Sequence, residues 1–178
     1  PPEIYIDTQG YGNKAPIGGV GRQYKIFSAR AFDRGDGAET EICASVWLNY
    51  GTALAVEYPL SGSVFTPDRA GEYTVVFISS DAVGNVSTNG YTVSVAEKIP
   101  EFYLSGLDDV KDEYFVGETL VPVRINAEGG SGEKDIEIFL LREDQISPMN
   151  TEYLFETEGK YILRITVTDY LGFMRVFD

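Results

Sequence analysis

The sequence predicts an all-β chain, built from two tandem β-sandwiches joined by a short linker. This prediction depends on the composition, an internal duplication and a period-two alternation of apolar residues. Twelve Tyr and ten Phe accompany short alternating runs of Thr and Val, and Leu-rich periodic stretches of the helical kind are missing. Such a composition is typical of β structure, so we expect almost no helix.

The duplication is visible in two stretches of similar sequence. Residues 71–85 read GEYTVVFISSDAVGN and residues 159–173 read GKYILRITVTDYLGF, with the Gly, Tyr, Asp and Gly at the same spacing. The start of each copy also matches, since PEIYI at 2–6 answers PEFYL at 100–104. Matches spread over this length indicate a tandem duplication.

Period-two alternation assigns the faces of the predicted strands. Arg164 marks the outward face of one strand, because burial of an unpaired charge is costly, and Glu137 does the same for an earlier strand. The inward positions are Tyr73, Val75, Phe77 and Ser79 with their counterparts Tyr161, Leu163, Ile165 and Val167, and Ile42, Ala44 and Val46 with Ile136, Ile138 and Leu140.

A third strand, residues 24–32, changes parity midway. Tyr24 and Ile26 share one face, whereas Phe27 and Ala29 continue on the other. We expect a bulge or a switch between sheets here, and Pro122 in the second copy agrees because proline lacks a ladder donor.

The copies predict one domain at 1–97 and a second at 98–178. Residues 96–100 form a join too short for a flexible tether, and Pro100 stiffens it. Only six residues follow Gly172, whereas Gly84 is followed by a strand at 91–95. We therefore expect the last strand of the second domain to be shortened or missing.

A resemblance to a known family rests on the duplicated stretches. AGEYTV at 70–75 resembles the Gly-x-Tyr-x-Cys stretch of immunoglobulin domains, with Val75 at the cysteine position, and EGKYIL at 158–163 repeats it. With DAVGN at 81–85, both copies resemble the bacterial immunoglobulin-like modules of secreted and cell-wall proteins. The resemblance implies two immunoglobulin-like β-sandwiches in an extracellular or cell-surface protein. It implies no particular ligand, because such modules serve as spacers, adhesins and appendages of carbohydrate-active enzymes.

Charge and cysteine content exclude several classes. The net charge of −14 repels nucleic acid and anionic membranes. Cys43 is the only cysteine, which excludes an internal disulfide. No apolar run has the length of a membrane span, and the first residues lack the features of a signal peptide.

Trp47 is the main candidate binding residue, because the repeat places its indole on an outward face. Sugar rings stack on exposed indoles, and Tyr50 or Tyr58 would extend the platform. A covering loop or a neighbouring module is the structural alternative.

Tyr73 and Tyr161 have a structural interpretation. Each follows a Gly by two residues at the start of an inward alternation. This position suits a tyrosine corner, whose hydroxyl bonds nearby backbone.

Two further motifs suggest integrin recognition and calcium binding. Arg34-Gly35-Asp36 is an integrin-recognition tripeptide in a Gly-rich connection, without an equivalent in the second copy. Calcium is a possible ligand of two acidic clusters without EF-hand spacing, namely Asp33, Asp36 and Glu39 in one loop and Asp108, Asp109, Asp112 and Glu113 in another. For Asp81 and Asp169 we expect hydrogen bonds to their own turns instead.

Catalysis has little support, because the chain contains no His and Cys43 has no evident activating partner. We therefore expect neither catalytic residues nor a cofactor. The sequence predicts a non-catalytic extracellular module, a rigid spacer or adhesion-type domain pair in a larger bacterial protein. The expected partners are protein or glycan at the cell surface. The alternative is a carbohydrate-binding appendage of a glycan-active enzyme. We expect a monomeric fragment of a longer chain, with no membrane insertion.

Overall fold

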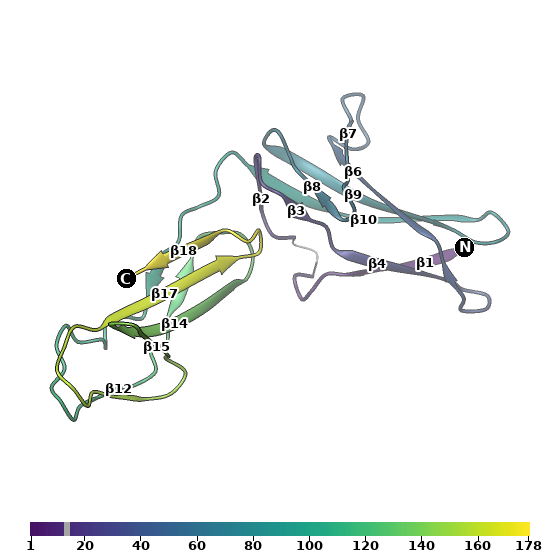
Figure 1. The fold of residues 1–178 in the computed structure, drawn as a ribbon. Coiled ribbons are helices and arrows are strands. Elements are labelled where there is room, and N and C mark those ends of the chain that lie inside the picture. The colour runs from purple at the N-terminus through teal and green to yellow at the C-terminus, as the bar shows by residue number, and fades with distance from the viewer. Residues whose placement is uncertain (13–14) are drawn as a thin grey trace. The chain divides into compact units, whose positions relative to one another are not determined.

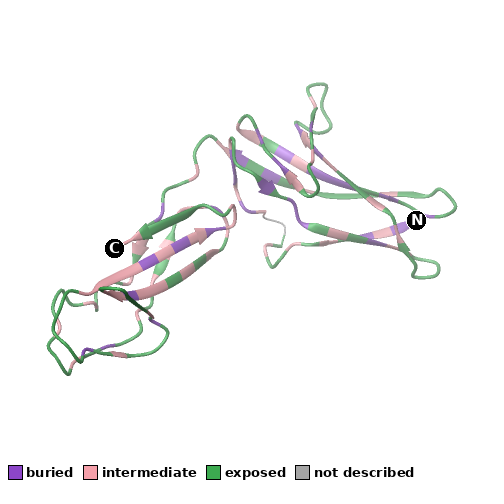
Figure 2. Cartoon of the chain, viewed as in Figure 1, coloured by how far each residue is buried: buried purple, intermediate pink, exposed green. Residues whose placement is uncertain are grey.

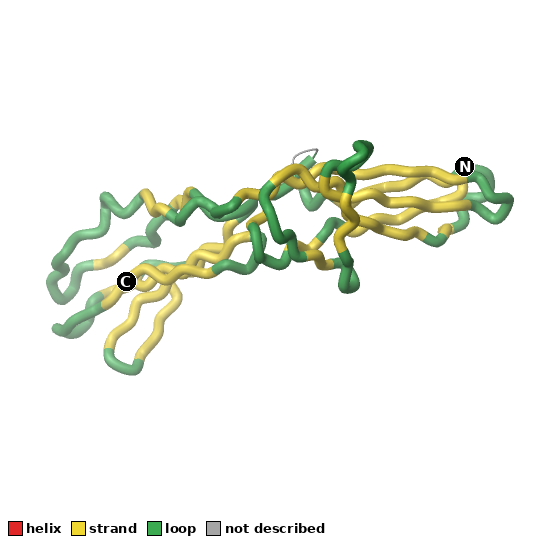
Figure 3. The backbone as a smooth tube through the Cα atoms, turned by 90° about the horizontal axis from the view of Figure 1, so that it is seen from above, coloured by secondary structure: helices red, strands yellow, loops and turns green. Residues whose placement is uncertain are grey.

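The structure is a computed structural model that describes residues 1–12 and 15–178. Its contacts divide the chain into two compact units, Pro1–Ile99 (unit 1) and Pro100–Asp178 (unit 2). The described residues form strands, turns and loops without a helix (Figure 3), which confirms the all-β fold class. The predicted domain boundary at 97/98 lies two residues before this division.

Unit 1 is a β-sandwich (Figure 1). One sheet has the order β1-β4-β5, the other has the order β2-β10-β9-β6-β7, and β3 pairs with β8. The strands are β1 (Pro2–Asp7), β2 (Gly18–Gly19), β3 (Tyr24–Lys25), β4 (Ser28–Asp33), β5 (Glu39–Thr40), β6 (Ile42–Leu48), β7 (Val56–Tyr58), β8 (Val64–Phe65), β9 (Gly71–Ser80) and β10 (Val86–Ala96).

The core of unit 1 is largely aromatic. Tyr24 contacts Phe65 at a centroid distance of 5.5 Å, and Phe65 contacts Tyr73 at 5.6 Å. Phe27 lies 4.8 Å from Tyr91, whose hydroxyl accepts the Phe27 N–H at 2.9 Å. These rings pack together with buried aliphatic residues such as Val46 and Val75.

The predicted change of parity at residues 24–32 is a switch between sheets. Tyr24 and Lys25 pair with β8, and after Ile26 and Phe27 the chain joins β1 as β4. Both Ile26 and Phe27 are buried although they are adjacent. A strand that changes sheet can bury consecutive side chains, which a regular period-two strand cannot.

Unit 2 has a similar arrangement of strands. Its sheet of order β15-β14-β17-β18 is accompanied by the pairs β11-β13 and β12-β16. The strands are β11 (Tyr103–Ser105), β12 (Thr119–Leu120), β13 (Asn126–Glu128), β14 (Lys134–Arg142), β15 (Gln145–Pro148), β16 (Tyr153–Leu154), β17 (Ile162–Asp169) and β18 (Met174–Phe177).

The register confirms the residue correspondence between the copies. Ile42 lies opposite Ser79 in unit 1, and Ile136 lies opposite Val167 in unit 2. Along β17, buried residues alternate with partly buried ones (Figure 2), as the period-two pattern predicts, and Arg164 forms an ion pair with Asp178 on the outward side. Most inward positions are therefore as predicted, but Ala44, predicted to face inward, is exposed, and Val76, predicted to face outward, is buried.

The last strand of unit 2 is present but short. β18 pairs with β17 from Thr168 to Ile165 only, whereas β10 pairs with β9 over its whole length from Ser80 to Gly71. Among the described residues, β18 therefore accompanies only the second half of β17.

Candidate functional site

Trp47 lies near the end of β6, on the face opposite the buried Val46 and Leu48. Its strand partners are Glu57 on β7 and Thr74 on β9. The indole is half-buried, and its N–H donates to the Ser45 hydroxyl at 2.9 Å. The outward placement predicted for Trp47 is thus found, with the indole N–H already bonded within the protein.

Tyr50 lies beside Trp47 because the chain turns after β6. Asn49 adopts a positive φ of 56°, and its carbonyl accepts the Thr52 N–H at 3.2 Å and the Thr52 hydroxyl at 2.8 Å. Tyr50 is 49% exposed, and its ring lies 6.2 Å from the Trp47 indole at 55°. The two rings form a tilted corner rather than a flat platform.

Tyr58 belongs to the core and not to this corner. It lies opposite Val46 and is 8% exposed, so it shares the inward face, and its ring packs 4.9 Å from that of Tyr73. Its hydroxyl donates to Asp68. The hydrogen bond from Arg69 and, after it, that from Tyr58 hold the pKa of the Asp68 carboxyl below its usual value. The structure therefore brings Trp47 and Tyr50 together and leaves Tyr58 out.

A depression adjoins the Trp47 corner at the β6–β7 edge. Its volume is about 310 Å³. Its lining mixes polar and apolar residues, namely Ala44, Ser45, Glu57, Tyr58, Pro59 and Leu60. Ser45 and Glu57 flank Trp47 in the sheet, so hydrogen-bonding groups lie next to the indole.

The two predicted tyrosine corners are present. The Tyr73 hydroxyl donates to the Arg69 carbonyl at 2.9 Å, and the Tyr161 hydroxyl donates to the Thr157 carbonyl at 3.0 Å, both four residues upstream. Burial, and then the hydroxyl of Tyr58, raise the pKa of Tyr73 well above its usual value. These tyrosines hold the fold and are not ligand-stacking residues.

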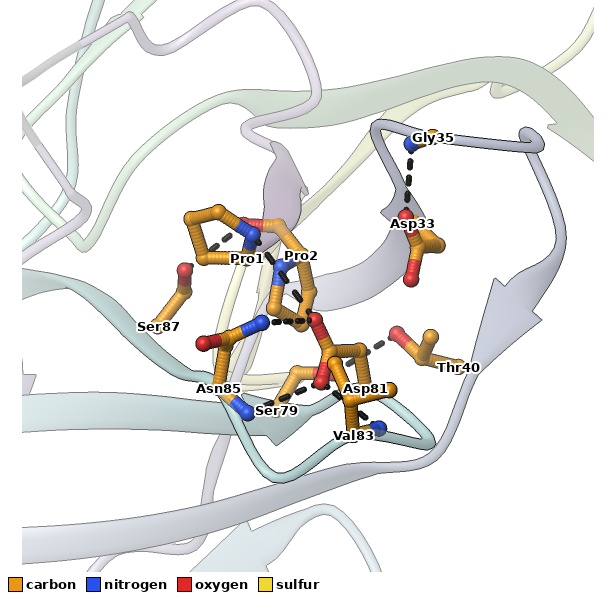
Figure 4. A network of polar contacts seen from close by, with 10 residues as sticks. All are labelled: Pro1, Pro2, Asp33, Gly35, Thr40, Ser79, Asp81, Val83, Asn85 and Ser87. Carbon is orange, nitrogen blue, oxygen red and sulfur yellow. Dashed lines mark hydrogen bonds and ion pairs between the residues drawn. The ribbon is translucent and has the colours of Figure 1, made fainter.

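Asp81 and Asp169 organise equivalent turns. Oδ1 of Asp81 accepts the N–H groups of Val83 at 3.1 Å and Asn85 at 2.8 Å (Figure 4), and Oδ1 of Asp169 accepts those of Leu171 and Phe173. The side-chain hydrogen bond from Asn85 is the largest influence that lowers the pKa of Asp81. Both carboxylates are buried and bonded to their own turns, as predicted.

The Arg34-Gly35-Asp36 tripeptide occupies an exposed, tightly bonded turn. Asp33 Oδ1 accepts the Gly35 N–H at 2.6 Å, and Asp36 Oδ1 accepts the Ala38 N–H at 2.9 Å. Arg34 forms an ion pair with Glu3 on β1 at 3.2 Å. The acidic and basic side chains of the tripeptide thus both have partners within the protein.

The predicted calcium ligands do not converge. Across residues 1–12 and 15–178, no three or more His, Cys, Asp or Glu side chains are grouped so that they could hold a metal ion. Asp33 and Asp36 instead bond the backbone of their turn, and the cluster at 108–113 lies in the connection between β11 and β12.

Sequence reasoning missed a groove in unit 2 of about 750 Å³. Tyr114, Phe115 and Val116 line one side, and Tyr161, just before β17, and Leu163 on β17 line another. Phe115 is 77% exposed, which is unusual for such a large apolar side chain.

The part of the chain that the structure describes contains no helix long and apolar enough to cross a membrane.

Comparison with known proteins gives similarity to solved structures. No family model matches the chain, and no curated protein matches it. Among solved structures, the chain is similar to the fibronectin(III)-like modules of Clostridium thermocellum CbhA. The identity is 13%, the match covers 98% of this chain and 91% of that chain, and the TM-score is 0.43.

Proposed function

We propose that this chain is a non-catalytic structural and interaction module of a larger extracellular bacterial protein, in which it acts as a stiff spacer. The observation that carries the proposal is the anchoring of the join on both of its sides. The Ile99 side chain packs against Gly19 of unit 1. A Cβ added at Gly19 would lie only 2.9 Å from the Cγ1 atom of Ile99. Pro100 is tied to unit 2, because its carbonyl accepts the Gly130 N–H at 2.8 Å.

The residues on either side of the join also belong to their own units. Ala96 lies in β10, and Phe102 is in the core of unit 2. A short join that contains Pro100 supports the spacer proposal.

The residues repeated between the units support a structural role. Four equivalent residues each make a hydrogen bond to the backbone within their own unit, namely Tyr73, Tyr161, Asp81 and Asp169. The chain has no His, and Cys43 is exposed. The net charge of −14 makes protein or glycan a better partner than nucleic acid.

Backbone ¹⁵N relaxation tests the spacer. We expect both units to report the same rotational correlation time. A control variant with a flexible Gly-Ser segment inserted between Ile99 and Pro100 is expected to give separate, faster values. If the unmodified chain already behaves like the insertion variant, the spacer proposal is wrong.

A second candidate function is carbohydrate binding at the Trp47 corner. The observation in its favour is the half-exposed Trp47–Tyr50 pair beside a depression that contains Ser45 and Glu57. Aromatic faces with adjacent hydrogen-bonding groups suit sugar rings.

A pull-down on insoluble polysaccharide tests this function. Retention of the chain, lost in Trp47→Ala and kept in a Val83→Ala control at another exposed apolar position, is the expected result. Failure to be retained, together with unchanged Trp47 fluorescence on a panel of soluble glycans, would rule it out.

A further inference from the structure

The middle of β10 carries the one Asn-Gly pair of the chain, Asn89-Gly90, and both residues are exposed. The Gly90 N–H donates to the Oδ1 atom of Asn89 at 2.8 Å. The Nδ2 amine of Asn89 donates to the Ile4 carbonyl on β1 at 3.0 Å. These two hydrogen bonds orient the Asn89 amide, with its oxygen toward Gly90 and its nitrogen toward β1.

The first of these bonds brings a nucleophilic nitrogen close to an amide carbon. The Cγ atom of Asn89 is one C=O bond of about 1.2 Å from Oδ1, so it lies within about 4 Å of the Gly90 nitrogen. Atoms that are ready to react are about 3–3.5 Å apart. The torsion about the Asn89 Cβ–Cγ bond has a broad minimum, so rotation of the amide turns the face of Cγ toward this nitrogen.

The Gly90 nitrogen is also open to approach, because glycine has no Cβ. The fold requires glycine at this position, since a Cβ added at Gly90 would collide with the Val75 carbonyl oxygen. β9 pairs with β10 at Gly90, whereas β2 pairs with β10 at Val95 and Ala96. Among the described residues, Gly90 therefore has a paired strand on one side, which leaves its peptide group freer to turn during ring closure.

We propose that Asn89 is a site of intramolecular deamidation in the folded chain. The Gly90 nitrogen forms a bond to Asn89 Cγ, the bond from Cγ to Nδ2 breaks, and Nδ2 leaves as ammonia with the proton of the Gly90 amide. The product is a cyclic imide. Water then opens this imide at Cγ, which gives aspartate, or at the main-chain carbonyl, which gives isoaspartate. Water is the only co-reactant, and no group is oxidised or reduced.

Asn85 provides an internal reference in the same unit. Its Nδ2 amine donates to Asp81 Oδ2 at 2.7 Å, and its own N–H donates to Asp81 Oδ1 at 2.8 Å, so Asp81 holds this amide. The next residue is Val86, whose branched side chain crowds the main-chain nitrogen. We therefore expect Asn85 to react more slowly than Asn89.

Deamidation to aspartate removes a connection between the two sheets of unit 1. β1 belongs to one sheet and β10 to the other. The Asn89 amide joins β10 to the Ile4 carbonyl, and the Ser87 hydroxyl donates to the Pro2 carbonyl at 2.6 Å. An aspartate carboxylate has no hydrogen to donate, so the bond to Ile4 is lost and two acceptors face each other. The bond from Ser87 remains.

Isoaspartate changes the strand itself. The main chain then runs through the former side chain, which adds one backbone carbon to β10. Asn89 lies opposite Phe77 and Gly90 lies opposite Val76 on β9. A strand with an added backbone atom cannot keep both pairs in register. We expect this product to destabilise unit 1 more than aspartate does.

Mass spectrometry of the whole chain tests the proposal, after ageing in neutral ¹⁸O-labelled water at physiological temperature and digestion in ordinary water. Asn85 and Asn89 lie in one tryptic peptide, and fragment ions separate them. We expect Asn89 to become a labelled carboxyl group at least about tenfold faster than Asn85. Both aspartate and isoaspartate should form, because direct hydrolysis of the amide gives aspartate alone. Equal rates at the two residues, or aspartate without isoaspartate, would overturn the proposal.

Asn89→Gln is the matched variant, because it keeps a side-chain amide but must close a larger ring. We expect residue 89 of this variant to lose its amide at least about tenfold more slowly than Asn89 does. The same rate in both chains would contradict attack by the Gly90 nitrogen.

Urea unfolding followed by Trp47 fluorescence tests the structural consequence, since Trp47 is the single tryptophan and lies in unit 1. We expect Asn89→Asp to raise the unfolding equilibrium constant about tenfold, because the bond to Ile4 is lost. Asn126→Asp, at an exposed position of β13 in unit 2, adds the same charge and should leave this transition unchanged. An unchanged transition in Asn89→Asp, or an equal shift in Asn126→Asp, would refute the predicted loss of the Ile4 bond.

Discussion

Replacing Tyr73 by Phe removes one buried hydroxyl and keeps the ring contacts with Tyr58 and Phe65. The lost bond to the Arg69 carbonyl is 2.9 Å long in a fully buried residue, and the carbonyl loses its partner. We expect unit 1 to lose about 1.5 kcal/mol of its free energy of unfolding. With an m value of about 1.5 kcal/mol/M, the urea midpoint falls by about 1 M.

The assay uses Trp47, the single tryptophan of the chain, which lies in unit 1. Its fluorescence follows the unfolding of that unit. Tyr161→Phe is the matched control, because its hydroxyl makes the equivalent bond in an exposed setting where water replaces it. We expect it to cost under about 0.5 kcal/mol by circular dichroism and to leave the Trp47 transition unchanged. An unaltered midpoint in Tyr73→Phe, or equal costs in the two variants, would refute the reasoning.

Three further outcomes concern pH and packing. Because the pKa of Tyr73 is raised in the fold, its stabilising contribution is present below about pH 10 and is lost as pH rises, so Tyr73→Phe should flatten the alkaline fall of the Trp47-monitored midpoint. The lowered pKa of Asp81 gives the opposite pH dependence, because its stabilising contribution is present above about pH 4 and is lost on acidification. The Asp81→Asn variant should therefore be less stable at neutral pH, and its thermal melting temperature should fall less on acidification. Gly130→Ala should lower the free energy of unfolding in urea by about 2–4 kcal/mol, because its Cβ would overlap the Phe102 ring. Gly172→Ala is the control, since Gly172 also has a positive φ but has open space around it, and it should cost about 1 kcal/mol. Equal costs would contradict the packing argument.

The groove and the Trp47 corner show where sequence reasoning stops. The repeat assigned Trp47 to an outward face, but it carried no information on the ring beside it, because Tyr50 is positioned by the positive φ of Asn49. Tyr58 was a candidate for the same platform, and the register of β7 against β6 places it opposite Val46 instead. Register between strands is a property of the pairing and not of either strand alone.

Residue patterns alone predicted the all-β class, the duplication, most inward positions, the tyrosine corners and the Asp turns. These features depend on local residue spacing and on a period of two, and both copies of the duplication contain them. Which side chains share a surface became clear from the folded chain, because it depends on the register of paired strands and on the turns between them. Contacts between segments distant in sequence follow from strand pairing and packing, and no pattern within one segment encodes them.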